Sequence, residues 1–272
     1  MMIRKLHEKD KRDVLKFLYD APEINLYLIG DINNFGFENP DVEFYAEFRD
    51  GDYFAVMSRN MSNITYFARN NDFNEDWITI FNTFDFLFIS CQESLMVEIK
   101  KHYPKMREDK MDFMKSTTFK RDESIDYSEI RILKDKKDAE KIYDLIETIP
   151  ELYTVHRKEK DEAIAYFMRH SNQNGTSVFI EDDGKVVANA SAVYETDKAA
   201  MIVAVATHKD YRKKGYGKKV MYYLMDLYIN HKEKTLCLYY DDPRAEALYK
   251  KLGFVDIERW SMLVPDDEST QY

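Results

Sequence analysis

The sequence has few of the residues and patterns that mark several large classes of protein. Its 272 residues include only 8 glycines and 6 prolines, which argues against long flexible linkers. No apolar run reaches the roughly 18 residues of a membrane span, so no membrane-spanning helix is expected. The charged start, MMIRKLHEKDKR, lacks the apolar stretch of a secretory signal.

Support for metal, disulfide or nucleic-acid chemistry is equally thin. Without a C-x-x-C pair or clustered histidines no metal site is expected. The two cysteines, Cys91 and Cys237, lie far apart in apolar runs and are expected to be buried free thiols in a cytoplasmic protein. The formal net charge of −10 argues against a nucleic-acid partner, because binding phosphates needs a broad basic surface.

Hydrophobic periodicity predicts alternating strands and helices in the first half. The expected strands are 3–6, 43–48, 52–57, 64–68, 86–91 and, more weakly, 111–119, and the expected helices are 10–19, 75–84 and 93–102. The segment 22–37 is apolar but irregular, with Gly30 and Gly36 interrupting it. A charged stretch, KRDESIDY at 120–127, marks the expected boundary between a domain at 1–121 and one at 122–272.

The opening of the second half resembles the opening of the first. Residues 130–146 align with residues 3–19 at a constant offset of 127. Two interpretations remain open: an internal duplication of one domain, or a coincidence between two common strand–turn–helix openings. Beyond this point a helix is expected at 161–170, and two strands, 176–181 and 186–193, are joined at Asp183-Gly184, a strong hairpin signal.

The most informative stretch is Ala199–Val220. A run of small and β-branched apolar residues, 199–206, predicts a buried strand, and RKKGYG at 212–217 then opens a helix extending to about Asn230. The free N–H groups and dipole of a helix N-terminus favour an anion, and glycine lets the backbone approach it closely. The simpler alternative is a basic helix start after a tight turn.

Known phosphate motifs narrow the identity of the anion. The P-loop pattern is absent, and Val220 stands where the dinucleotide fingerprint needs its third glycine. What remains is R-x-x-G-x-G. Further on come an expected strand at 235–240, an amphipathic helix at 244–252 and a strand from Phe254 to about Val264, and they contain D-x-x-A-x-x-L-Y-x-K-x-G-F from Asp242 to Phe254.

These two motifs, in this order, resemble those of the GNAT superfamily of N-acetyltransferases, over roughly residues 130–264. The resemblance implies an α+β (mixed α/β) fold of two GNAT-like domains in tandem, each with a central, mostly antiparallel mixed sheet flanked by helices. The first domain lacks R-x-x-G-x-G and would be degenerate. Asp242 replaces the family's usual asparagine, so a neutral amide contact to the cofactor is not expected there.

The resemblance also implies a cosubstrate, acetyl-CoA, and a set of residues that bind it. The strand would bind the pantetheine arm, the loop would bind the pyrophosphate, and Tyr249 would protonate the departing thiolate. The implied cofactor-binding residues are Ala204, Val205, Ala206, Thr207, Arg212, Lys213, Lys214, Gly215, Tyr216, Gly217, Lys218, Asp242 and Tyr249.

The acceptor would be a primary amine attacking the thioester directly, but the sequence does not identify that amine. The strand 199–206 carries no carboxylate, so the general base stays open among His208, Glu195, Asp241 and a water molecule. His156 and Glu151 could line a substrate pocket. The rival readings are an acyl-CoA-binding module without catalysis, with a partner-binding first domain, and an RNA-directed protein. The protein would be a monomer or a homodimer.

Overall fold

The computed structural model describes residues 1–149, 152 and 159–266, and these form two compact units. The first unit contains Met1–Phe113 together with two short later segments, 240–242 and 256–266. The second unit contains Met114–Tyr239 and Pro243–Val255. The units are therefore not continuous in sequence, and the division of the chain into domains at 121/122 stays a prediction.

The first unit is built on a mixed sheet. Its strand order is β1-β2-β3-β4-β5-β12-β6, with β1 at Met2–Lys5, β2 at Val42–Arg49, β3 at Asp52–Asn60, β4 at Asn63–Ala68, β5 at Phe88–Gln92, β12 at Val255–Val264 and β6 at Arg107–Ser116. The neighbours β1–β2, β2–β3, β3–β4 and β5–β12 are antiparallel, and β4–β5 is parallel.

Helices cover both faces of this sheet. Alternate side chains of a strand point to opposite faces, so neighbouring residues of one strand pack against different helices. On β3, Val56 packs in a cluster with residues of α1 (Lys11–Leu18) and α2 (Leu26–Phe35). Its neighbours Ala55 and Met57 pack in another cluster with residues of α3 (Asp76–Phe81) and α4 (Glu93–Lys100). Short 3₁₀ turns, η1 at Glu8–Asp10 and η2 at Arg69–Asn71, complete the unit.

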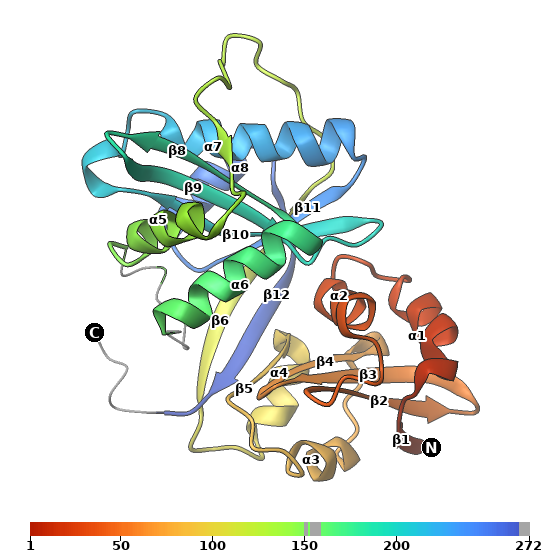
Figure 1. The fold of residues 1–272 in the computed structure, drawn as a ribbon. Helices are drawn as coiled ribbons and strands as arrows, with labels where there is room; N and C mark the ends of the chain where they lie inside the picture. Colours follow the sequence, from red (N-terminus) through yellow and green to blue (C-terminus); the bar gives the residue numbers. More distant parts are fainter. Residues whose placement is uncertain (150–151, 153–158, 267–272) are drawn as a thin grey trace. The chain divides into compact units, whose positions relative to one another are not determined.

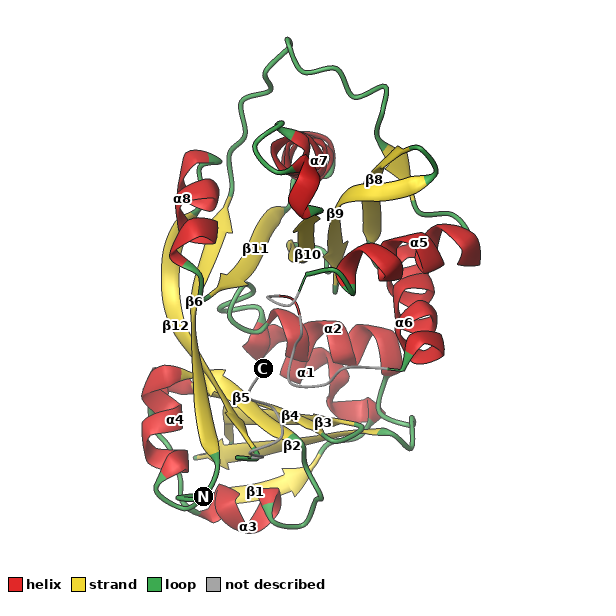
Figure 2. Ribbon diagram, turned by 90° about the vertical axis from the view of Figure 1, so that its left-hand side faces the viewer, coloured by secondary structure: helices red, strands yellow, loops and turns green. Residues whose placement is uncertain are grey.

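The second unit repeats this plan with the strand order β7-β8-β9-β10-β11. Its elements are β7 (Arg131–Ile132), α5 (Lys136–Ile146), α6 (Lys160–Gln173), β8 (Thr176–Asp182), β9 (Lys185–Val193), β10 (Ala199–Thr207), the 3₁₀ turn η4 (Lys209–Tyr211), α7 (Tyr216–Met225), the π-helical turn η5 (Asp226–His231), β11 (Thr235–Tyr240) and α8 (Pro243–Lys251). Helix α7 packs against β8, β9 and β10, and α5 and α6 lie on the other face (Figures 1 and 2).

The two units share their strand topology and an arginine–aspartate ion pair near their first strand. In each, the first three strand pairs are antiparallel and the fourth, β4–β5 or β10–β11, is parallel. Arg4 on β1 makes hydrogen bonds of 2.7 and 2.8 Å with Asp10, and Arg131 on β7 makes one of 3.3 Å with Asp138. The predicted mixed α/β fold, with mostly antiparallel strands in each unit, is confirmed, and both aligned openings fold as a short strand followed by a helix.

A few local expectations need adjusting. The irregular segment 22–37 contains a helix, α2, with Gly30 in its interior; Ile29 and Ile32 face the core, and Asn25 donates a hydrogen bond of 2.9 Å to the Leu18 carbonyl. Both cysteines are free and buried, as predicted. No helix in the described residues is long and apolar enough to cross a membrane. Within the same ranges, no group of three or more His, Cys, Asp or Glu side chains could hold a metal ion.

Candidate active site

The two parallel strands that precede and follow α7 stay paired over only part of their length. Their register runs from Ala199 opposite Thr235 to Ile202 opposite Leu238. Strand β10 continues to Thr207 and β11 to Tyr240, and no further pair between them is found in the described parts of these strands. The edge of β10 from Val203 onward is therefore not covered by β11, and an extended ligand could pair with it.

This free stretch of β10 contains a bulge. On the β9 side, Val203 is opposite Ser191 but Ala206 is opposite Asn189, so β10 has one residue more than β9 between these pairs. Ala204 adopts a φ of 53°, in the left-handed region. For a residue with a Cβ this conformation costs roughly 1–2 kcal/mol. The bulge changes the direction of successive N–H groups at the point where β10 loses its neighbour.

The loop after β10 has the geometry that its glycines predicted. Gly215 is the N-cap of α7 with a φ of 87°, and a Cβ there would meet no atom within 4 Å. At Gly217, a Cβ would lie 2.9 Å from the Thr207 hydroxyl, so α7 begins in close contact with the end of β10. The first bond of the helix runs from the Lys219 N–H to the Gly215 carbonyl, and the preceding N–H groups of the first turn have no intrahelical acceptor.

The cations of the loop divide into paired and unpaired ones. Lys218 lies 3.9 Å from Asp122, and Lys219 pairs with Glu129. Lys214 stacks its ammonium over the Tyr211 ring, 4.6 Å from the centroid. Neither Lys213 nor Lys214 forms an ion pair with any carboxylate of the described residues, and both are exposed. Positive charge is thus left uncompensated beside the free N–H groups of α7.

Tyr249 and Asp242 differ in their surroundings. Tyr249 projects from α8 into a buried position with 8% exposure, and desolvation by burial raises the pKa of its phenol to about 12. The phenol is therefore protonated at neutral pH and able to donate. Asp242 is half-buried just before α8 and belongs to the first unit by its contacts.

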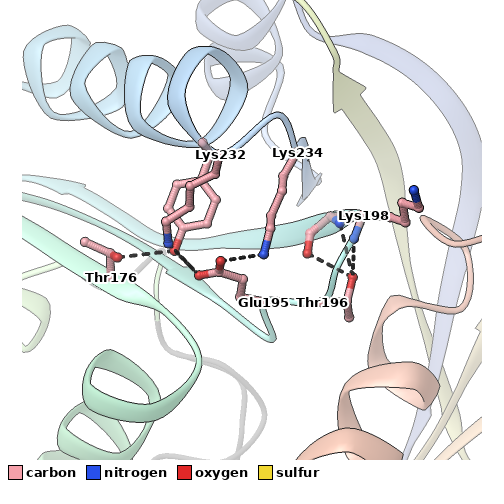
Figure 3. Close-up of polar contacts among 8 residues, drawn as sticks. Thr176, Glu195, Thr196, Lys198, Lys232 and Lys234 are labelled. Carbon is pink, nitrogen blue, oxygen red and sulfur yellow. Dashed lines mark hydrogen bonds and ion pairs between the residues drawn. The ribbon is translucent and has the colours of Figure 1, made fainter.

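Glu195 is placed unfavourably for the role of general base. It lies in the turn before β10, and the stretch Ala199–Ile202, which is paired with β11, separates it from the uncovered edge that begins at Val203. Its carboxylate accepts hydrogen bonds from Lys232 (2.8 Å) and Lys234 (2.6 Å), as Figure 3 shows. It also accepts one from the Tyr228 hydroxyl (3.0 Å). Burial alone would raise the pKa of Glu195, but the two lysines lower it by more than burial raises it, so the pKa lies below its usual value.

The other candidate bases are not distinguished by their contacts. His208 is the N-cap of η4, and its Nδ1 accepts a long bond of 3.4 Å from the Asp210 N–H, which fits a turn residue. Asp241 is exposed. His156 and Glu151 lie outside the described residues.

Sequence reasoning missed one residue of this region, Asn189. Its side chain is fully buried on β9 and donates a hydrogen bond of 2.9 Å to the Ala204 carbonyl at the bulge. The only available signal was the presence of two polar residues, Asn189 and Ser191, in an otherwise apolar run, VVANASAV.

Comparison with known proteins agrees with this geometry. Residues 139–254 match the family model described as the acetyltransferase (GNAT) family. No curated protein matches the chain. The matched segment of the second half is therefore similar to the GNAT acetyltransferase family, whose members transfer acyl groups from acyl-CoA to an acceptor.

Solved structures extend the likeness to nearly the whole chain. A GCN5-related N-acetyltransferase from Sphaerobacter thermophilus is 11% identical, with 96% of this chain and 94% of that one covered and a TM-score of 0.62. A tandem GNAT protein from the clavulanic acid biosynthesis pathway is 10% identical, with 96% and 97% covered and a TM-score of 0.58. A Drosophila protein is 14% identical, with 97% and 99% covered and a TM-score of 0.66. At these identities the likeness shows the fold, which is that of a tandem GNAT protein.

Proposed function

We propose that the protein is an N-acetyltransferase that moves the acetyl group of acetyl-CoA to a primary amine by direct attack in a ternary complex. The observation that carries this proposal is the separation of β10 from β11 directly before the Gly215 loop, inside the segment that matches the GNAT model. The uncovered edge of β10 comes first along the chain and the N-terminus of α7 follows it. A ligand with a thioester at one end and a diphosphate further along could pair with the strand edge and bind the helix N-terminus at the same time.

In this proposal the loop holds the pyrophosphate. The amides of Lys213–Lys218 donate to its oxygens, and the left-handed conformation at Gly215 keeps the entrance free of a side chain. Arg212, Lys213 and Lys214 add positive charge. The close contact between Gly217 and Thr207 fixes the distance from this cradle to the strand.

The strand edge holds the rest of the cosubstrate and the reacting group. The amides of the pantetheine arm pair with the uncovered edge at Ala204–Thr207, which has small side chains at Ala204 and Ala206. Backbone N–H groups of the same stretch stabilise the oxyanion that forms when the amine attacks the thioester carbonyl.

Proton transfers complete the reaction. Tyr249 donates to the departing thiolate, and its raised pKa keeps the phenol proton available at neutral pH. The base that deprotonates the substrate ammonium is His208, Asp241 or a water molecule. Asp242 beside α8 leaves a charged group where a neutral amide is usual in the family, which favours a second candidate: an acyl-CoA-binding module without turnover, with a partner-binding first domain.

The deciding experiment measures thiol release from acetyl-CoA over a panel of amines, together with acetyl-CoA binding by calorimetry. Gly215→Glu places a carboxylate in the cradle and should weaken binding at least tenfold by repulsion and bulk. Gly51→Glu is a matched control, because Gly51 also has a left-handed φ, 92°, with open space around it, but lies in the β2–β3 turn.

Three results have different meanings. Amine-dependent release that Gly215→Glu abolishes and Gly51→Glu leaves within twofold supports the transferase. Tight binding without release for any amine selects the binding module. Normal acetyl-CoA binding by Gly215→Glu refutes the loop as the cofactor site.

A further inference from the structure

The bulge in β10 is occupied by an alanine rather than a glycine. Ala204 has the left-handed φ that glycine adopts freely and that a side chain disfavours. Neither β9 nor β11 offers a registered partner to Ala204 or Val205 in the described strands. The registered pairs at Val203 and Ala206 flank the bulge but do not involve these two residues, so a side-chain contact to the bulge itself would help to hold the conformation.

The contact at that position comes from Asn189. Its Nδ2 donates a hydrogen bond of 2.9 Å to the Ala204 carbonyl and a longer, weaker one of 3.4 Å to the Ser191 hydroxyl. The Asn189 side chain has no solvent exposure. Since only the amide nitrogen can donate to a carbonyl, this bond also determines which way the amide faces.

The arrangement leaves one polar atom unsatisfied. The Oδ1 of Asn189 is buried without a hydrogen-bond partner among the described residues. A buried orphan acceptor destabilises a fold, and an apolar side chain of similar size would avoid it. The amide is thus unfavourable for packing at this position, and what it contributes is the bond to Ala204.

We propose that Asn189 is a positioning residue for acyl transfer. By holding the Ala204 carbonyl it fixes the left-handed turn in β10, and with it the direction of the backbone N–H groups that follow. This inference rests on the proposed function, in which those N–H groups stabilise the oxyanion. Asn189 itself touches neither substrate, so its removal affects the transition state more than binding of the cosubstrate.

The test compares Asn189→Leu, Asn189→Leu with Ala204→Gly, and Ser191→Ala. Leucine fills the site and removes both the donor and the orphan acceptor, so the fold should remain stable. We expect the kcat of Asn189→Leu to fall at least tenfold, with acetyl-CoA affinity within about threefold of the wild type. Glycine at 204 should restore most of the lost kcat, because it adopts a left-handed φ without help. Ser191→Ala should stay within about twofold.

A second readout does not depend on activity. Amide hydrogen exchange over residues 203–206 should quicken in Asn189→Leu and not in Ser191→Ala. A kcat within twofold of the wild type, or a lost kcat that Ala204→Gly leaves unrestored, overturns the positioning role. If the wild type releases no thiol with any amine, the proposed function fails, and the exchange measurement still decides whether Asn189 holds the bulge: unchanged exchange overturns it.

Discussion

The contact between Gly217 and Thr207 makes a sharp prediction about the proposed cofactor loop. In Gly217→Ala the new Cβ would lie 2.9 Å from the Thr207 hydroxyl oxygen, and ordinary contact begins at 3.4 Å. Either the Thr207 side chain rotates away or the start of α7 and the end of β10 move apart by roughly 0.5 Å. In the free protein the first turn of α7 can relax, but a ligand bound to both elements requires the original spacing.

The expected size of the effect follows from the strain. Adding a methyl group to a tightly packed position costs about 1–3 kcal/mol. If this cost arises mainly on binding, acetyl-CoA affinity falls by about fivefold to about a hundredfold. Thr207→Ala removes the oxygen that the new methyl group meets, so Thr207→Ala with Gly217→Ala should recover affinity relative to Gly217→Ala alone.

A double-mutant cycle measured by calorimetry checks the reasoning. The cycle removes whatever Thr207→Ala does by itself, and the remaining coupling should be about 1 kcal/mol or more in favour of the double variant. Additive effects, within about 0.5 kcal/mol, would mean that the contact does not set the spacing between loop and strand.

Two further variants test individual side chains. Tyr249→Phe should lower kcat by about tenfold or more with acetyl-CoA binding within twofold, and since the phenol pKa is about 12 the wild type should show no loss of kcat from this group up to about pH 10; an unchanged kcat would remove Tyr249 from the mechanism. Glu195→Gln should destabilise the fold by about 1–3 kcal/mol at pH 7, because Lys232 and Lys234 lose their partner, while kcat per folded molecule is unchanged. Because the pKa of Glu195 is lowered in the folded state, its ionised carboxylate stabilises the fold above the unfolded pKa, and this stabilisation is lost as the pH falls through the folded-state pKa. Urea titrations should therefore show the stability deficit of Glu195→Gln shrinking toward pH 3. A lost kcat without lost stability would return Glu195 to the list of candidate bases.

Local patterns predicted the part of the site that depends on residues close in sequence. The apolar run 199–206, the glycines at 215 and 217 and the spacing of Ala245 and Tyr249 each specify one element, and β10, α7 and α8 form where expected. Asp183-Gly184 likewise forms the β8–β9 turn, with Gly184 at a φ of 77°.

Features that depend on distant contacts could not be read in this way. Alanine at 204 gives no local sign of a left-handed φ, because the conformation goes against its own preference and Asn189 lies 15 positions away. Helix α2 was missed because four apolar residues in a row precede Gly30 and mostly polar residues follow it, which hides the helical period. Glu195 looked available in sequence because the two lysines that hold it come from beyond α7.

The last strand, β12, has a consequence for biosynthesis. It pairs with β5 in the first unit, where Trp260 donates to the Ser90 hydroxyl across a separation of 170 residues and Leu263 joins the core. At a synthesis rate of about 5–20 residues per second, β5 waits roughly 10–30 s for this partner. During that delay β5 presents an unpaired edge to other nascent chains. A gene cut between the two halves would produce a first fragment that lacks β12, so its β5 edge would stay unpaired and prone to aggregation.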